Sequence, residues 1–245
     1  MRFFNFELYY AIRKVYQLKR KVGCLIIHGF AGNFSEIEPL NKHLLKEGFI
    51  TLCPKLEGHT GNKKDLAGTN YLQWLQSAEE GLIKLKEKCE EIILIGFSMG
   101  GLIAINLALK HKISALITLS TPIYYWDIKR VGLNIIDDFK NMEFIYFKSY
   151  VKAAFRIPFV AMINFKLLLS KTKPLVNEIQ CPIFVAQGLI DDTVKHKSAE
   201  YIYTKSASKI KEVKYYDNSK HVICCGKDKK TLFKDITMFV NAYVQ

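Results

Sequence analysis

Five short, almost continuously apolar segments, separated by longer helix-like stretches, constrain the fold of this chain more than any other feature. Strands without polar alternation are typical of a parallel sheet covered by helices on both faces, so we expect these five to be buried. A sixth segment alternates less cleanly between polar and apolar residues, and we expect it nearer an edge. The five segments, and then the sixth, are residues 22–28, 48–53, 91–97, 114–120 and 181–187, and 210–216.

The stretches between these segments carry helix signals. Residues 35–47 open with Ser35 ahead of two glutamates and end at Gly48, which are a start and a stop signal. In residues 70–89, leucine and isoleucine recur at roughly helical spacing, at Leu72, Leu75, Leu82, Ile83 and Leu85. Further helices are expected over 99–111, 196–206 and 229–243. Regular alternation of strand and helix predicts an α/β fold with an open, mostly parallel, doubly wound sheet.

Residues 121–178 interrupt this alternation, because they hold no clear strand and are rich in aromatic residues and lysine. We expect a small, mainly helical lid inserted into a core domain made of residues 1–120 and 179–245. The insertion follows a strand directly, so its base should lie at the carboxyl edge of the sheet, where α/β sheets bind ligands. At least one of its first aromatic residues should line a substrate pocket; the alternative is that they pack only on one another and on the core. These aromatic residues are Tyr124, Tyr125 and Trp126.

The charge balance is basic, with 36 Lys and Arg against 23 Asp and Glu and a formal net charge of +13. The lysines are scattered rather than gathered in an arm or strip, which favours solvated faces and no nucleic-acid partner. None of the six cysteines belongs to a C-x-x-C pair, and several lie in apolar runs, as expected of reduced cysteines in a cytoplasmic protein.

Neither a signal peptide nor a membrane span is expected. The aromatic and basic stretch 1–20 is broken by Asn5 and Glu7 and is followed by no small-residue cleavage site, and no apolar run reaches about 18 residues. Weak peripheral membrane contact through an amphipathic helix at this end is left open. The sequence does not indicate an oligomeric state.

The segment Gly96-Phe97-Ser98-Met99-Gly100 directly follows an expected strand and precedes an expected helix. In that context Gly-x-Ser-x-Gly is a nucleophile elbow, a turn so tight that the flanking positions tolerate almost no side chain. The turn would place the Ser98 hydroxyl at a helix N-terminus, where the helix dipole and free N–H groups favour developing negative charge. The alternative, a serine in an ordinary turn, does not explain the paired glycines.

A serine hydroxyl needs a base and an orienting acid to act as a nucleophile. The elbow predicts the chain order serine, acid, histidine. His221, in a loop after the last expected strand, is the candidate base, and His196 is expected to begin a surface helix. The acid should follow the strand 181–187, where Asp191 and Asp192 are adjacent. Asp217, four residues before His221, is the less favoured candidate. The residues alone do not choose among the three.

Five motifs together, LIIHGFAGN, GHTG, IGFSMGG, QGLIDDTV and SKHVI, resemble the α/β-hydrolase superfamily in order and spacing from about residue 22 onwards. The chain looks most like small bacterial carboxylesterases, close to the monoacylglycerol lipases. The resemblance implies Asp191 as the acid, through the pattern Gly188-x-x-Asp191-x-x-Val194. It also implies His221 as the base, although Lys220 stands where the family more usually has glycine.

The same resemblance implies an oxyanion hole made by the backbone N–H groups of Phe30 and Met99. His28 and His59 would then be structural residues of their loops. The implied reaction is the hydrolysis of a short- to medium-chain carboxylic ester, a small-molecule substrate, through an acyl-enzyme, with no metal and no organic cofactor. A monoacylglycerol lipase, a thioesterase, an enzyme that cleaves an N-terminal peptide bond and a non-catalytic ligand-binding module are the alternatives.

Overall fold

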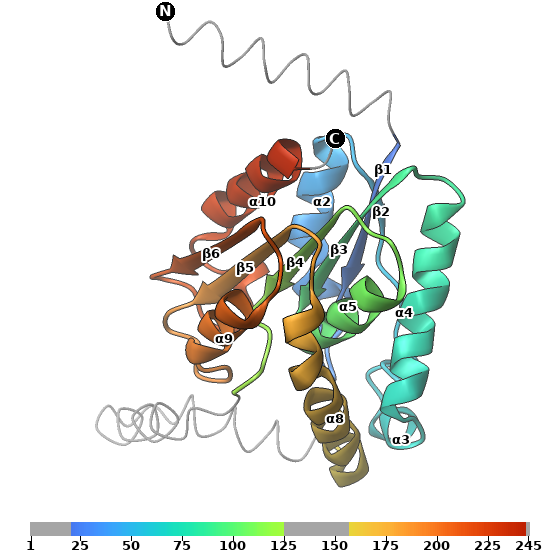
Figure 1. Ribbon diagram of the computed structural model, residues 1–245. Helices are drawn as coiled ribbons and strands as arrows, with labels where there is room; N and C mark the ends of the chain where they lie inside the picture. Colours follow the sequence, from blue (N-terminus) through green and yellow to red (C-terminus); the bar gives the residue numbers. More distant parts are fainter. Residues whose placement is uncertain (1–20, 125–156, 244–245) are drawn as a thin grey trace, which may run out of the picture.

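The computed structural model describes residues 21–124 and 157–243 of the chain (Figure 1). The strands are β1 (Val22–Ile27), β2 (Ile50–Leu52), β3 (Glu91–Phe97), β4 (Ala115–Leu119), β5 (Ile183–Gly188) and β6 (Lys211–Tyr216). The helices are α2 (Glu38–Lys46), α3 (Lys63–Ala67), α4 (Tyr71–Lys86), α5 (Met99–Lys110), α8 (Phe159–Thr172), α9 (Lys197–Lys205) and α10 (Lys229–Tyr243). Three short 3-10 helices are η1 (Phe34–Glu36), η2 (Lys173–Glu178) and η3 (Ile223–Cys225).

The described strands form one six-stranded sheet in the order β2-β1-β3-β4-β5-β6, and every neighbouring pair is parallel. The predicted doubly wound α/β fold is therefore confirmed. β6 lies at one edge, as its mixed composition indicated. The expectation that residues 48–53 form a fully covered strand is wrong, because β2 is a three-residue strand at the other edge and Ile50 is exposed.

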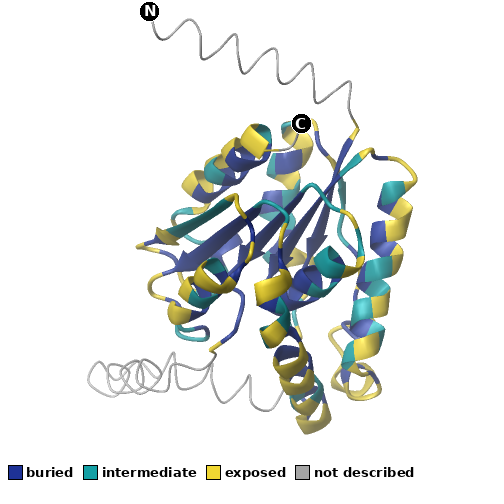
Figure 2. Cartoon of the chain, viewed as in Figure 1, coloured by how far each residue is buried: buried dark blue, intermediate teal, exposed yellow. Residues whose placement is uncertain are grey.

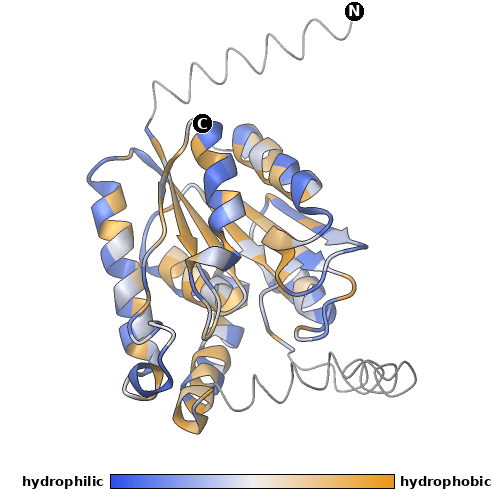
Figure 3. Ribbon diagram, turned by 180° about the vertical axis from the view of Figure 1, so that it is seen from behind, coloured by the Kyte–Doolittle hydropathy of each residue, from blue (hydrophilic) through white to orange (hydrophobic). Residues whose placement is uncertain are grey.

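Helices cover both faces of the sheet (Figures 1 and 2). The side chains of the strands pack into a separate hydrophobic core on each face. Along β1, Leu25 and Ile27 pack in the core under α4, α5, α8 and α9, whereas Cys24 and Ile26 pack in the core under α2 and α10. Side chains of a strand alternate between faces, so a strand buried on both sides has to be apolar throughout. The strands are mainly hydrophobic, whereas the helices carry both hydrophobic and hydrophilic residues (Figure 3).

Helix α4 shows where the periodicity of the sequence misleads. Its N-terminus is closed by a capping box in which the Asn70 side chain accepts from the backbone and Gln73 bonds back. The residues that α4 buries are Trp74, Ala78, Gly81, Leu82 and Leu85. Of the residues noted for their helical spacing, Leu72 and Ile83 are 59% and 50% exposed. The spacing was helical, but the small residues Ala78 and Gly81, rather than Leu72 and Ile83, complete the inward stripe.

The helix expected over 35–47 is divided in two. Asn33, rather than Ser35, caps the first turn by accepting the Ser35 backbone N–H at 2.8 Å, and this turn is the 3-10 helix η1. α2 begins only at Glu38, with Pro39 in its first turn. A proline lacks the N–H of an interior helical residue but fits the first turn, where that donor has no partner. Pro39 therefore marks the true start of the helix.

Only the two ends of the insertion 121–178 fall within the described residues, and its later end is helical in α8 and η2. Several apolar side chains of α8 face outward: Phe159, Val160, Ile163 and Leu167. No helix in the described ranges is both long and apolar enough to cross a membrane. Tyr125 and Trp126 lie outside the described residues.

Candidate active site

The loops that carry the candidate residues meet at one edge of the sheet because all six strands point the same way. Residues 28–33, here called the β1 loop, follow β1, and Ser98 follows β3. β1 and β3 are adjacent in the sheet, whereas β1 and β2 pair on the opposite side of β1. A reversal of strand order of this kind opens a crevice at the carboxyl edge, where ligands bind in open α/β sheets.

Ser98 lies in the strained turn that the sequence predicted. Its φ of +52° and ψ of −120° place a non-glycine residue in a region that favours glycine. The Ser98 N–H donates to the Leu119 carbonyl at 2.8 Å, which ties the turn to β4. A Cβ at Gly96 would collide with the backbone of Gly100, and one at Gly100 would collide with the Ile27 carbonyl. Both glycines are therefore required by the close approach of β3, α5 and β1.

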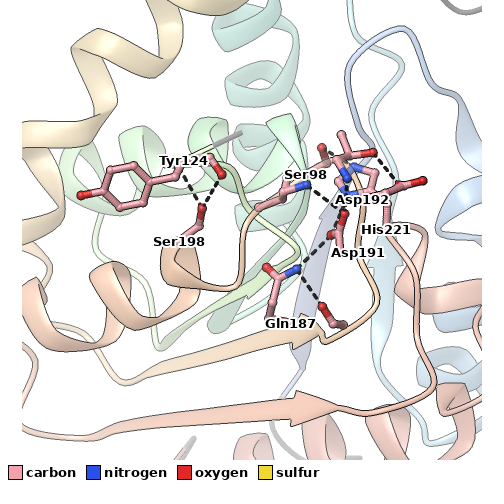
Figure 4. A network of polar contacts seen from close by, with 10 residues as sticks. Ser98, Tyr124, Gln187, Asp191, Asp192, Ser198 and His221 are labelled. Atoms are coloured by element: carbon pink, nitrogen blue, oxygen red, sulfur yellow. Dashed lines mark hydrogen bonds and ion pairs between the residues drawn. The ribbon is translucent and has the colours of Figure 1, made fainter. Parts of the chain in front are cut away.

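The side chains of Ser98, His221 and Asp191 form a continuous hydrogen-bonded chain (Figure 4). His221 Nε2 lies 3.0 Å from Ser98 Oγ, and His221 Nδ1 lies 2.9 Å from Asp191 Oδ2. An ionised carboxylate can only accept hydrogen bonds, so Nδ1 carries the proton and Nε2 is left to accept from the serine hydroxyl. Ser98 directly follows β3, Asp191 lies in the loop after β5, and His221 lies in the loop after β6. The fold thus brings together Ser98 and His221, which are 123 residues apart in the chain.

Asp191 is held by four donors. Its Oδ1 accepts the backbone N–H groups of Thr193 at 2.8 Å and Val194 at 2.9 Å, and its Oδ2 accepts Gln187 Nε2 at 2.9 Å in addition to His221. The Asp191 side chain is only 1% exposed, so this shell fixes a carboxylate that bulk water scarcely reaches. The geometry thus places Asp191 where the resemblance put the acid.

The two other carboxylates considered from the sequence are placed differently. Asp192 accepts a hydrogen bond from the Thr193 hydroxyl at 3.2 Å and is half-buried, and Asp217 is exposed. Gln187 was not singled out from the sequence, although it bonds the same oxygen as His221. The one signal for it is a polar residue at the end of an otherwise apolar buried strand.

The loop that carries His221 is anchored on the start of α10. Asp228 Oδ2 accepts the Asn218 backbone N–H and the Ser219 hydroxyl, each at 2.9 Å. The Phe97 ring packs beside the imidazole, with 5.2 Å between ring centroids. Lys220, which departs from the usual glycine, is exposed. With lysine in place of the usual glycine at this position, the His221 imidazole still bonds both Ser98 and Asp191.

The electrostatic surroundings of His221 favour its charged form. Burial alone lowers the pKa of His221, but the charge and hydrogen bond of Asp191, together with the charges of Glu36 and Asp192, outweigh burial. The pKa of His221 therefore lies above its ordinary value of 6.5.

If His221 acts as a base, kcat/KM for an ester should be low at pH 5 and rise through an apparent pKa above 6.5, because only the neutral imidazole can accept the serine proton. Initial rates with a p-nitrophenyl ester between pH 5 and pH 9 would measure this profile. His196→Gln is the matched control, since His196 is the exposed N-cap residue of α9 and should leave the profile unchanged. A profile that is flat over this range would contradict a histidine base.

Phe30, in the β1 loop, lines the same cavity as Ser98. Within the described part of the chain, neither the Phe30 N–H nor the Met99 N–H donates to a protein acceptor. The Phe30 ring is stacked on Phe165 of α8, with ring centroids 5.2 Å apart, and also packs against Trp74. The role of these two N–H groups as an oxyanion hole stays a prediction.

The histidines expected to be structural make local contacts. His28 Nδ1 bonds the Gly29 carbonyl at 2.9 Å, and His59 Nδ1 bonds the Glu57 carbonyl at 3.1 Å. Both are buried, and their rings lie 5.2 Å apart. Burial lowers the pKa of His28 and lowers that of His59 to about 4, so both imidazoles are neutral near pH 7.

A cavity of about 180 Å³ adjoins Ser98 and His221. Its other described lining residues are Gly29, Phe30, Glu36, Phe97, Pro122, Ile157, Met162, Phe165, Thr193 and Val194. Tyr124 does not line it. Instead, its ring packs against Tyr201 under the Lys173 ammonium, beside a separate cavity, and its backbone bonds Ser198 (Figure 4).

Tyr124 thus lies at a different cavity from Ser98, and the expectation that at least one of the three aromatic residues lines the substrate pocket is left to the other two. Tyr125 and Trp126 stay predictions. The described residues hold no group of three or more His, Cys, Asp or Glu side chains that could bind a metal ion.

Comparison with known proteins places the chain. Residues 25–178, more than half of the 245-residue chain, match the family model of the alpha/beta hydrolase fold. A thermostable monoacylglycerol lipase of Bacillus sp. strain H-257 is 27% identical over 227 residues, covering 87% of this chain and 88% of its own. A carboxylesterase of Bacillus subtilis strain 168 is 25% identical over 223 residues, covering 88% and 91%.

Among solved structures, one of metagenome-derived lipolytic enzymes has a TM-score of 0.77 at 19% identity, covering 91% of this chain and 94% of its own. That likeness concerns the fold, and it agrees with the parallel sheet and the serine turn described above. With the family match over residues 25–178 and the two bacterial relatives, the chain belongs to the α/β-hydrolase fold family.

Proposed function

We propose that the protein is a serine carboxylesterase that hydrolyses short- to medium-chain carboxylic esters through an acyl-enzyme on Ser98. The observation that carries the proposal is the hydrogen-bonded chain from Ser98 through His221 to Asp191, with the serine in a strained turn at the N-terminus of α5. A binding module would have no need of a strained serine whose hydroxyl bonds a half-buried imidazole.

In the acylation step, Ser98 Oγ attacks the ester carbonyl carbon while His221 Nε2 takes the hydroxyl proton. Asp191 keeps the Nδ1 proton in place and stabilises the imidazolium that forms. The carbonyl oxygen becomes an oxyanion, which accepts the N–H groups of Phe30 and Met99; each such donor is worth on the order of 3 kcal/mol of barrier. The tetrahedral intermediate collapses when His221 gives the proton to the leaving alcohol.

Deacylation repeats these steps with water. His221 takes a proton from the water as its oxygen attacks the acyl carbon, and the second tetrahedral intermediate expels Ser98 Oγ, which recovers the proton. The carboxylic acid leaves and the enzyme returns to its starting state. Every proton and electron pair in this cycle is accounted for by the three side chains, the ester and water, so no cofactor is required.

The size of the cavity supports a small acyl or alcohol group. Its volume of about 180 Å³ is below the range of about 300–1,000 Å³ that is common for pockets of drug-sized ligands. Pro122, Ile157, Met162 and Phe165 all lie within residues 121–178, so the insertion contributes much of the apolar wall. We propose that this insertion is a lid that selects the substrate by size.

A monoacylglycerol lipase is the second candidate, because the relative from Bacillus sp. strain H-257 carries that name. Both activities use the same serine chemistry and differ in the alcohol that leaves. A direct comparison of 1-monobutyryl-glycerol with butyl butyrate would separate them, since a preference of tenfold or more for the glycerol ester would favour the second candidate.

We expect kcat/KM for p-nitrophenyl esters to rise about fourfold for each added methylene while the cavity has room, because each buried methylene contributes roughly 0.8 kcal/mol, and then to fall. Met162→Ala should move the optimum to longer chains, since Met162 lines the cavity. Tyr124→Ala is the matched control and should leave the optimum in place, because its ring faces a different cavity.

Trp126→Ala tests the remaining prediction for the start of the lid. A chain-length profile identical to that of the wild type would remove Trp126 from the pocket. Efficient turnover of emulsified long-chain triacylglycerol would contradict a lid that limits acyl length.

A further inference from the structure

Glu36 places a carboxylate inside the cavity that adjoins Ser98. It is the last residue of η1 and is partly buried, and among the described lining residues it is the only acidic one. In the sequence, Glu36 was noted only as one of the two glutamates after Ser35 that indicate the start of a helix. Nothing in the acylation and deacylation steps above uses it. A charged group in a mainly apolar wall calls for a reason, because burying a carboxylate costs free energy unless it is bonded or paired.

The first part of that reason is a contact with the β1 loop. Glu36 Oε2 accepts the Gly29 backbone N–H at 3.2 Å. A Cβ added at Gly32 would collide with both carboxylate oxygens of Glu36, and a Cβ at Gly29 would come within 3.2 Å of Oε2. The loop from Gly29 to Gly32 is thus folded around the carboxylate, in space that only glycine leaves free.

This contact bears on the proposed oxyanion donor. The Gly29 carbonyl accepts from His28 Nδ1 at 2.9 Å and from the Gly32 N–H at 3.3 Å, while the Gly29 N–H is held by Glu36. The peptide between Gly29 and Phe30 is planar, so fixing the Gly29 carbonyl also fixes the direction of the Phe30 N–H on its other side. Glu36 is therefore one of the groups whose hydrogen bonds to Gly29 fix the direction of the Phe30 N–H.

The second part of the reason is charge. The pKa of Glu36 lies above its ordinary value, because burial raises it more than the Gly29 hydrogen bond and the charge of His221 lower it. In turn, the charged groups that act on His221 are Asp191 and Asp192 from the loop after β5, and Glu36 from η1; Lys220, on the same loop as His221, is exposed. The imidazole thus lies in the field of carboxylates from two separate elements of the fold.

We propose that Glu36 is a positioning residue for acyl transfer, which holds the Phe30 N–H in line through Gly29 and places a further negative charge beside His221. This inference rests on the proposed function, because it assigns Glu36 a role in the same reaction. The proposed role has two parts, the hydrogen bond to Gly29 and the negative charge near His221. Two different substitutions of Glu36 can distinguish them.

Glu36→Gln keeps the size of the side chain and an acceptor oxygen but removes the charge. We expect its kcat at high pH to stay within about threefold of the wild type, while the apparent pKa of the kcat/KM profile moves to lower pH. Glu36→Ala removes both, and its kcat should fall by about tenfold to a hundredfold with little change in KM, as expected when one oxyanion donor is misaligned.

Glu38→Gln is the matched control, because Glu38 lies two residues away, pairs with Lys42 on α2, and does not line the cavity. Its profile should coincide with that of the wild type. If Glu36→Gln gives an unchanged or raised apparent pKa, or if the same shift appears in Glu38→Gln, the charge role is overturned. If a folded Glu36→Ala protein keeps wild-type kcat, the loop-holding role is overturned.

Failure of the proposed function would look different. In that case the wild-type protein itself would hydrolyse no ester and would not react with a phosphonate at Ser98. A wild type that reacts at Ser98, alongside Glu36 variants that behave as the wild type does, would overturn the role of Glu36 alone.

Discussion

Ser98→Ala should lose nearly all esterase activity, with kcat falling by about a millionfold or to the rate of the uncatalysed reaction. Removing a triad serine costs an effect of that order in a serine protease, because no other group can form the acyl-enzyme. In this protein the next available path is direct attack by water, which lacks the 3.0 Å contact between Oγ and His221 Nε2. Initial rates with a p-nitrophenyl ester at pH 8 would measure the loss.

The matched control for this substitution is Ser98→Gly. Alanine keeps the strain of a side chain at a φ of +52°, whereas glycine adopts this conformation readily, and the difference is on the order of 1–3 kcal/mol. Both variants should be inactive, and the glycine variant should have the higher Tm. An alanine variant that stays active would show that Ser98 is not the nucleophile.

Asp191→Asn should lower kcat by about four orders of magnitude, while Asp192→Asn and Asp217→Asn should stay within about threefold of the wild type. All four groups that bond the Asp191 carboxylate are donors, so an amide nitrogen has no suitable place among them. With the amide nitrogen turned towards His221, the imidazole must accept at Nδ1 and carry its proton on Nε2, the wrong tautomer for a base.

Steady-state rates of the three asparagine variants at one pH would make this comparison. Thermal unfolding of each variant would show whether the fold is retained, because Asp191 is also buried. Activity lost in Asp192→Asn and kept in Asp191→Asn would mean that the loop after β5 adopts another arrangement in the working enzyme.

The succession of strands and helices along the chain and the serine turn were predictable from local sequence. An apolar run that ends in Gly96-Phe97-Ser98 leaves few alternatives, because the two flanking glycines are needed only where backbone segments approach closely. The elements and the turn depend on residues close to one another in the chain. His221 was instead a candidate through chain order, since it lies in the loop after the last strand, 123 residues from Ser98.

The choice between Asp191 and Asp192 was not predictable from residue types, because adjacent side chains on a loop point in different directions. In the fold it is the Asp191 carboxylate that bonds His221, and its turn is closed by the N–H groups of Thr193 and Val194. The resemblance to a family implied Asp191 where local chemistry left the choice open. Gln187 was not singled out because a polar residue at the end of a strand does not by itself reveal that it bonds Asp191 in the loop that follows. The contact of Glu36 with the Gly29 N–H of the β1 loop likewise depends on how that loop folds.

The errors have a common cause. Leu72 and Ile83 have helical spacing but face solvent, and residues 48–53 are apolar but form a short edge strand. Hydrophobic pattern predicts that an element exists, while packing against neighbours decides which residues it buries. Tyr124 likewise lies near the catalytic edge in sequence, yet its bonds to Ser198 turn it elsewhere.

The central claim is that Ser98 is an activated nucleophile, and covalent labelling tests it most directly. Wild-type protein and the Ser98→Ala variant would be treated with a fluorophosphonate at pH 8, and intact-mass and peptide mass spectrometry would locate the adduct. The account predicts one adduct per wild-type chain, on Ser98, and none on the variant. A parallel treatment below pH 5 should give no adduct, because protonated His221 cannot accept the serine proton. An unlabelled wild-type chain, or an adduct on another residue that persists in Ser98→Ala, would contradict it.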